Sequence, residues 1–368
     1  MRAPDGTRAS AGARDRPSLW TAAASAALLA VGFRRRRGAI RSGPRPDGMP
    51  GRDGAEHGRL AATPSEIPAR GWKDILWRVY EKIADDRVLA ISAGVAFYVL
   101  LSIFPGIGAL VALYGLFADP ATIAGHVDAI GDVAPGGTAD LIKDQIARIS
   151  AQGNRTLGVA FVVGLAISLW SANSGIKALF DALNIVYSEK EKRGFFSLNA
   201  VSLTFTVGAV LFLLVALTGV VVLPIVLNFV GIGSSTDWLV RLARWPVLFV
   251  VVGLALAVIY RHGPSREKPQ WRWITWGSAT AAVAWVATSV LFSWYVASFG
   301  SYNKTYGSLG AVIAFMTWIW LSVIIVLMGA ELDAEMEHQT ARDTTTGGGK
   351  PFGSRGARMA DTIGEARS

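Results

Sequence analysis

The chain of 368 residues contains no cysteine and only four histidines. Without cysteine it has no disulfide, no thiolate metal site and no cysteine nucleophile. No two histidines have the H-x-H or H-x-x-x-H spacing of a metal site, and no glycine-rich loop ends in Lys-Ser or Lys-Thr to hold a nucleotide phosphate. The sequence therefore predicts a protein that is not an enzyme, needs no cofactor and hydrolyses no ATP itself.

Charged residues are also scarce, at 17% of the chain against 52% hydrophobic residues. Six stretches almost lack them, and five of these reach the roughly 20 residues that an α-helix needs to cross a bilayer. The fourth is shorter, but Arg244 and Arg261 at its ends can extend toward the two interfaces. We expect an all-α polytopic membrane protein with six transmembrane helices, at about 88–118, 156–178, 198–230, 245–260, 273–298 and 306–330.

The positive charges predict the orientation of these helices. Twelve Lys and Arg residues lie in 71–87, 177–193 and 261–272, and six lie in the segments expected on the opposite side. Since cytoplasmic loops carry the excess of basic residues, both termini are expected in the cytoplasm. The net charge of +9 follows this topology, so nucleic acid is not an expected partner. Nothing in the sequence sets an oligomeric state.

Residues 71–87, just before the first span, have the pattern of an amphipathic helix. Charged side chains cover one face, and apolar ones recur on the other at helical spacing. The apolar stripe consists of Trp72, Ile75, Leu76, Val79, Tyr80 and Ile83. Such a helix is expected to lie in the cytoplasmic interface of the lipid bilayer and to lead into the first span. An ordinary soluble helix that caps the bundle is the alternative.

The composition of the two ends predicts disorder. Residues 1–70, rich in Gly, Pro, Ala and Arg, are expected to form a disordered basic tail with one weak apolar segment at 19–33, too short for a confident span. Residues 339–368 are expected to form a second disordered tail, which leaves 71–338 as the membrane domain. The outer loop 119–155 is expected to form a solvated cap over the bundle.

Several stretches of the spans resemble a known family. They are residues 170–187 (WSANSGIKALFDALNIVY), the Tyr306–Ser308 and Gly329–Glu331 ends of the last span, and Phe97-Tyr98 with Phe104-Pro105 in the first span. Together they resemble the YihY/BrkB family of bacterial inner-membrane proteins over about residues 65–340. The resemblance implies a six-helix protein of the bacterial plasma membrane. Members were once labelled ribonuclease BN, a label regarded as mistaken, and transport of compatible solutes or envelope lipid has been suggested for some relatives.

Polar side chains on the second predicted span form the first candidate site. They recur at spacings of three or four and so share one helix face. They are Trp170, Asn173, Lys177, Asp181 and Asn184, with Ser174 beside them. In one interpretation the stripe lines a hydrated path. In the other, Asn173 and Ser174 only join helices, and Lys177 and Asp181 already lie among the headgroups.

The last span supplies the second candidate. Glu331 follows 25 uncharged residues that begin at Tyr306, and Ser308 lies at the other end of this span. A carboxylate at the cytoplasmic end of a span is expected to pair with Lys177 or Arg193, or to exchange protons along a substrate path. Two further carboxylates, Asp333 and Glu335, are expected to be solvated.

Three residues predict interruptions of the spans: Pro105 with Gly106 in the first and Pro224 in the third. In transporters such breaks expose backbone carbonyls to a substrate, although proline kinks also occur in membrane helices without that role.

The sequence as a whole favours a protein that moves, or helps to move, a small solute or an envelope lipid. The alternative is a non-transporting envelope scaffold or assembly factor, in which the polar stripe is packed dry. The ribonuclease interpretation is rejected, because the chain lacks a His/Asp cluster that would hold a catalytic metal.

Overall fold

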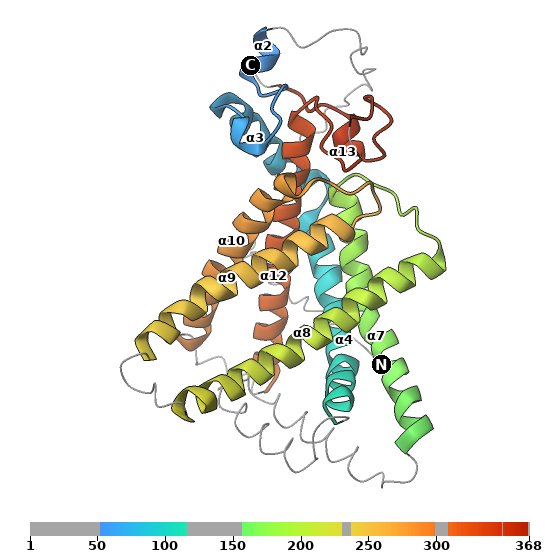
Figure 1. The fold of residues 1–368 in the computed structure, drawn as a ribbon, viewed down its shortest axis with the longest axis vertical. Coiled ribbons are helices and arrows are strands. Elements are labelled where there is room, and N and C mark those ends of the chain that lie inside the picture. Colours follow the sequence, from blue (N-terminus) through green and yellow to red (C-terminus); the bar gives the residue numbers. More distant parts are fainter. Residues whose placement is uncertain (1–51, 116–156, 230–236, 299–307, 348, 367–368) are drawn as a thin grey trace, which may run out of the picture. The chain divides into compact units, whose positions relative to one another are not determined.

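The computed structural model describes residues 52–115, 157–229, 237–298, 308–347 and 349–366 (Figure 1). These residues form helices and no strand, with one isolated bridge between Pro269 and Thr345, so the all-α prediction is confirmed for them. The apolar segment 19–33 and the outer loop 119–155 lie outside the described residues.

Six long helices make up most of the described part of the chain. They are α4 (Val88–Gly115), α7 (Leu157–Val186), α8 (Phe195–Phe229), α9 (Asp237–His262), α10 (Trp271–Ser298) and α12 (Ser308–Gln339). Five of them are long and apolar enough to cross a membrane, while the apolar part of α9, Pro246–His262, is shorter. A membrane protein with five such helices is therefore observed, and a sixth span remains a prediction.

The long helices associate in two groups. In the first, α7 packs against α4, and α8 contacts both of them; in the second, α10 packs between α9 and α12. Helix α12 joins the groups, because it also contacts α4 and α7. Buried side chains at the centre of this arrangement include Leu183, Tyr260, Ile274 and Leu327.

Helices α10 and α12 approach each other through glycines. A Cβ atom on Gly329 would lie 2.6 Å from the Cβ of Ala281 and 2.6 Å from the hydroxyl of Tyr260, and one on Gly277 would meet the carbonyl of Gly329. The Tyr260 hydroxyl donates a hydrogen bond to the carbonyl of Val326, at 2.7 Å. Small residues permit this close backbone contact, as in other membrane bundles.

The segment before the first span forms helix α3 (Ala69–Asp85). Ile75 and Val79 of its predicted apolar stripe are buried against α12, beside Met336, whereas Leu76 and Tyr80 are exposed. Asp86 caps the end of the helix, and Arg87 adopts a left-handed conformation with φ of 52°, which turns the chain directly into α4. The stripe is thus divided between a packed half and an exposed half.

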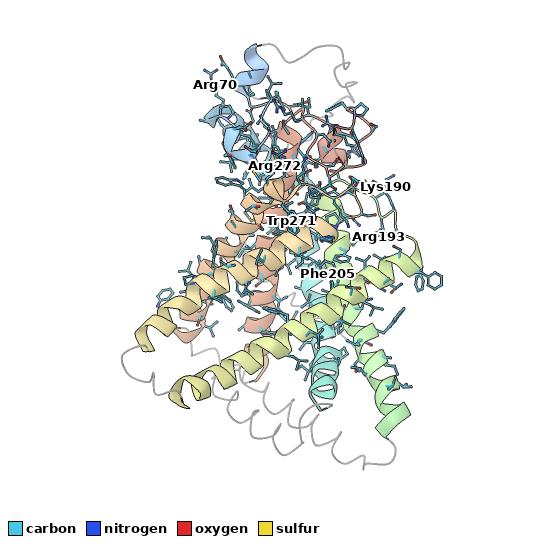
Figure 2. The ribbon with its side chains drawn as sticks, in the orientation of Figure 1. Arg70, Lys190, Arg193, Phe205, Trp271 and Arg272 are labelled. Atoms are coloured by element: carbon cyan, nitrogen blue, oxygen red, sulfur yellow. The ribbon has the colours of Figure 1, made fainter. Side chains whose placement is uncertain are left out.

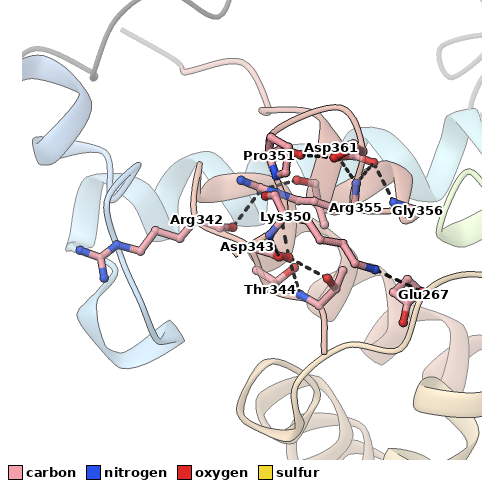
Figure 3. Close-up of polar contacts among 12 residues, drawn as sticks. Glu267, Arg342, Asp343, Thr344, Lys350, Pro351, Arg355, Gly356 and Asp361 are labelled. Carbon is pink, nitrogen blue, oxygen red and sulfur yellow. Dashed lines mark hydrogen bonds and ion pairs between the residues drawn. The ribbon is translucent and has the colours of Figure 1, made fainter. Parts of the chain in front are cut away.

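The C-terminal segment is not the disordered tail that its composition predicts. The Arg355 side chain is buried and donates hydrogen bonds to the carbonyls of Ala341, at 2.7 Å, and Ala360, at 2.6 Å. The Asp361 carboxylate accepts from the backbone N–H groups of Arg355 and Gly356 (Figure 3). These contacts order a polar segment that has only the short helix α13 (Arg358–Asp361).

Residues 52–68 differ from the predicted tail in the same way. They form helix α2 (Arg52–Glu56) and the 3-10 helix η1 (Pro64–Glu66), and Ala61 and Ile67 are buried. The Thr340 hydroxyl donates to the carbonyl of Ala61, at 2.7 Å. The two segments therefore cover the end of α12 together. Composition did not reveal this, because the contacts join residues almost 280 positions apart.

Candidate functional site

The three segments with the larger share of basic residues meet at one end of the bundle, called here the capped end. The backbone N–H of Ser265, between α9 and α10, donates to the side chain of Asn184 on α7, at 2.7 Å. Arg193, between α7 and α8, donates to the carbonyl of Gly263, at 2.8 Å. Lys190, Arg193, Trp271 and Arg272 all lie toward this end in Figure 2.

A second polar region lies within the helices, between α7, α8 and α4. We call it the mid-bundle polar cluster, and it comprises Ser102, Asn173, Ser174, Ser202 and Thr206. The Thr206 hydroxyl lies 3.1 Å from Oδ1 of Asn173 and 2.9 Å from the carbonyl of Ser202. Asn173 is fully buried, and its Nδ2 has no hydrogen-bond partner. The cluster therefore contains a buried donor without an acceptor.

The rest of the mid-bundle polar cluster joins α4 to α7. The hydroxyls of Ser102 and Ser174 are 3.1 Å apart, and the backbone N–H of Gly175 donates to Ser102, at 3.0 Å. A Cβ on Gly175 would lie 2.9 Å from the Ser102 oxygen, so a glycine permits this approach. Asn173 is almost equally far from the two ends of its candidate span, Val162–Val186. Asn173 thus lies near the middle of its candidate span.

The polar stripe predicted on α7 is divided by the fold. Asn173 and Asn184 are buried, but Trp170 is 52% exposed and Asp181 is also exposed. The ammonium of Lys177 lies over the Trp170 ring, 5.1 Å from its centroid. The stripe follows one edge of the helix, with the two asparagines turned inward and the other side chains turned outward.

Asn184 connects the loops of the capped end. Its Nδ2 donates to Oε2 of Glu191, at 3.0 Å, while its Oδ1 accepts from Ser265. Arg193 donates to both oxygens of Glu191, at 2.8 and 2.7 Å. The hydrogen bonds from Arg193 lower the pKa of the Glu191 carboxyl to about 2. Asn184 and Glu191 therefore stabilise the turn between α7 and α8.

The acidic residues at the end of α12 are buried, which corrects the prediction that Asp333 and Glu335 are solvated. Glu331 and Asp333 have no exposed surface, and Glu335 has 1%. Oδ1 of Asp333 accepts from the backbone N–H of Gly277, at 2.8 Å. Helix α3 and the segments that cover the end of α12 exclude water from these groups. Their burial could not be inferred from the nearby sequence.

Glu331 pairs with neither of the cations predicted for it. Arg193 is bound to Glu191, and Lys177 lies over Trp170. Both oxygens of Glu331 are buried and accept no hydrogen bond. The Asp86 carboxyl lies within hydrogen-bond reach of Glu331, and Glu335 and Lys82 are the other charged neighbours. Burial raises the pKa of the neighbouring Asp86 carboxyl above its usual value. Glu331 is thus a carboxyl group without a compensating ion pair.

Two buried ion pairs hold the neighbouring acids. Arg78 of α3 lies 2.5 Å from Glu335, and Arg266 donates to both oxygens of Glu337. Burial alone would lower the pKa of the Arg266 guanidinium, but the Glu337 carboxylate raises it above its usual value. These contacts connect α3 and the α9–α10 loop to α12.

The remaining predicted positions are Tyr306, Ser308, Pro105, Gly106 and Pro224. Tyr306 lies outside the described residues, and Ser308 is the first residue of α12. Pro105 and Gly106 lie within α4, and Pro224 lies within α8. The sequence did not identify four residues as members of the polar cluster or of the buried ion pairs: Ser102, Ser202, Thr206 and Arg266. The spacing of Asn199, Ser202 and Thr206 along one face of α8 was the available signal for two of them.

Comparison with known proteins identifies relatives of this chain. Residues 79–351 match the family model described as virulence factor BrkB. The Bacillus subtilis (strain 168) protein YfkH, whose name calls it ribonuclease-like, is 31% identical over 66% of this chain and 88% of its own length. A UPF0761 membrane protein of Pseudoalteromonas translucida (strain TAC 125) is 26% identical over 74% of this chain and 88% of its own length. No solved structure matches.

The family model covers well over half of the chain, and it agrees with the resemblance carried by the motifs of the spans. The membrane proteins among the relatives agree with the five long apolar helices. The chain is therefore a membrane protein that belongs to the BrkB virulence-factor family.

Proposed function

We propose that this protein spans the bacterial inner membrane six times, with both termini in the cytoplasm, and moves a small solute or an envelope lipid. The orientation rests on the basic residues of the capped end, since cytoplasmic segments carry the excess of Lys and Arg. The sixth span is α9, whose helix extends beyond its apolar part to Asp237.

The observation that supports transport is the unpaired amide of Asn173. A polar group without a partner is costly in a membrane interior, so such groups usually face water, a substrate or another polar group. Binding sites of transporters lie near the middle of the bilayer, and Asn173 is near the middle of its candidate span. An oxygen of a solute or a lipid headgroup is the acceptor that Nδ2 lacks.

The alternative, a non-transporting scaffold, uses the same residues differently. There the mid-bundle polar cluster would only join α4, α7 and α8. The hydrogen bonds between Ser102 and Ser174, and between Thr206 and Asn173, are of the kind that joins membrane helices. The unused Nδ2 is the feature that the scaffold leaves without a role.

A flux assay separates the two functions. The purified full chain is reconstituted in liposomes and tested with labelled osmolytes and labelled lipids. Thr206→Val removes the hydroxyl beside Asn173 at constant shape, and Thr204→Val is the matched control, because Thr204 is exposed on the same helix. We expect flux that Asn173→Ala and Thr206→Val reduce and Thr204→Val preserves. Absence of flux for the whole panel, or equal flux in all variants, would favour the scaffold.

A further inference from the structure

Helix α3 exposes apolar side chains on the side turned away from α12. Leu76 is 58% exposed and Tyr80 69% exposed. They belong to a shallow groove lined by Ala69, Trp72, Lys73, Leu76, Trp77 and Tyr80. Lys73 is the one charged residue in this lining, and no carboxylate belongs to it. The opposite side of α3, with Ile75 and Val79, is buried against α12.

The ends of α3 are held at the level where two spans begin. The Trp72 ring lies 5.9 Å from that of Trp276, which is in the second turn of the span Trp271–Val296. At the other end, Asp86 and Arg87 alone separate the helix from Val88, the first residue of its own span. A helix of 17 residues is about 25 Å long. Its axis therefore runs along the boundary of the spans instead of away from it.

The exposed face of α3 continues onto the outer surface of α10. Trp271 and Trp276 are 50% and 47% exposed there, and Val283, one of the exposed apolar residues that follow, is 56% exposed. The guanidinium of Arg261 lies over Trp271, 4.5 Å from the ring centroid. Aromatic side chains beside Lys and Arg are typical of the interface between membrane and cytoplasm.

We propose that the face of α3 formed by Trp72, Lys73, Leu76 and Tyr80 rests on the cytoplasmic leaflet and binds anionic phospholipid. In this position Leu76 enters the acyl chains, the aromatic rings lie among the headgroups, and the ammonium of Lys73 binds a lipid phosphate. The bilayer is the fitting occupant, because this face is continuous with the membrane-facing surface of α10. The inference is independent of transport and holds for a scaffold as well.

The absence of cysteine makes a direct test possible. The full chain with Leu76→Cys or Tyr80→Cys is spin-labelled and reconstituted in vesicles of phosphatidylglycerol and phosphatidylcholine. Asp85→Cys, on the exposed charged side of α3, is the control. We expect labels at 76 and 80 to be accessible to oxygen and shielded from a water-soluble nickel complex, with the reverse at 85. Nickel access at all three sites would overturn the proposal. So would shielding of 76 and 80 from both reagents, which indicates a protein partner.

A second comparison tests the headgroup charge. The label at position 80 is examined in vesicles of phosphatidylcholine alone and in vesicles that contain phosphatidylglycerol. We expect less nickel access when the anionic lipid is present, and loss of that difference in Lys73→Gln. Lys190→Gln, which changes an exposed lysine at the same end, is expected to keep the difference. Equal access in both kinds of vesicle would refute recognition of anionic lipid at this face.

Discussion

Arg266 binds Glu337 through two hydrogen bonds, of 2.9 and 2.8 Å, between side chains that are 1% and 0% exposed. The guanidinium lies 3.9 Å from the centroid of the Tyr187 ring, and the Thr344 hydroxyl donates to Glu337, at 3.0 Å. Parallel hydrogen bonds between guanidinium and carboxylate are the strong form of an ion pair. This pair connects the residue that follows α7, the α9–α10 loop and the C-terminal segment to the end of α12.

Removal of one partner of this pair should destabilise the protein strongly. Glu337→Gln leaves the Arg266 charge buried and uncompensated, and we expect it to lower the free energy of unfolding by about 3–5 kcal/mol. Denaturation in detergent micelles measures this change. Glu56→Gln is the control, because the Arg70–Glu56 pair is largely exposed, and its effect should stay below about 1 kcal/mol. Similar losses in the two variants would contradict the importance of burial.

The same substitution at Glu331 should have the opposite effect. Neither oxygen of Glu331 receives a hydrogen bond, so Gln keeps the shape, removes a potential charge and supplies an N–H group near Asp86. We expect Glu331→Gln to raise the thermal midpoint at neutral pH, whereas Glu337→Gln lowers it. A lower midpoint for Glu331→Gln would contradict this, because it would mean that the Glu331 carboxyl group stabilises the folded protein.

The pair formed by Glu191 and Arg193 predicts a pH dependence. Because the pKa of Glu191 falls from 4.5 to about 2 in the folded protein, its carboxylate stabilises the fold above about pH 4.5. That contribution is lost as the pH decreases toward 2. We expect the stability difference between wild type and Glu191→Gln, under about 1 kcal/mol for a partly exposed pair, to vanish over this interval. If Glu191→Gln has the same pH-dependent effect on stability when Arg193→Gln is also present, Arg193 is not the cause of the lowered pKa.

The close contact of α10 and α12 predicts a difference between glycines. Gly329→Ala places a methyl group 2.6 Å from Ala281 and should cost about 1–3 kcal/mol, because the helices must separate. Gly208→Ala on α8 has no atom within 4 Å of the new Cβ and should be neutral or slightly stabilising. Thermal unfolding of both variants in the same detergent gives the comparison. Equal stability of the two would argue against a tight α10–α12 interface.

The helices were predictable because membrane spans depend on a local property, the absence of charge over about 20 residues. The predicted fifth span, 273–298, lies within α10, and the first begins at Val88 as α4 does. The last span was predicted to end at 330, whereas α12 continues to Gln339. There the charges end the apolar run but not the helix, because helix formation tolerates Glu and Asp that lipid does not.

The candidate site was only partly predictable. Helical spacing identified Asn173 and Asn184 as neighbours on one face of α7, but it did not reveal that Trp170 and Asp181 turn outward. The partner of Asn173 is Thr206, which belongs to a different helix. In the sequence Thr206 looks no different from Thr204, a threonine two residues earlier that is exposed. Burial alone distinguishes these two threonines.

The sequence by itself determined that the chain is a helical membrane protein, which segments are apolar and which family it belongs to. These properties follow from local composition and from motifs within single helices. The tertiary structure alone decided that Asp333, Glu335 and Glu337 are buried, that Arg78 and Arg266 compensate two of the acids at the end of α12, and that Glu331 has no cation of its own. The reason is physical: the cost of burying a charge depends on the groups around it in space. Here those groups come from α3, the α9–α10 loop and the C-terminal segment.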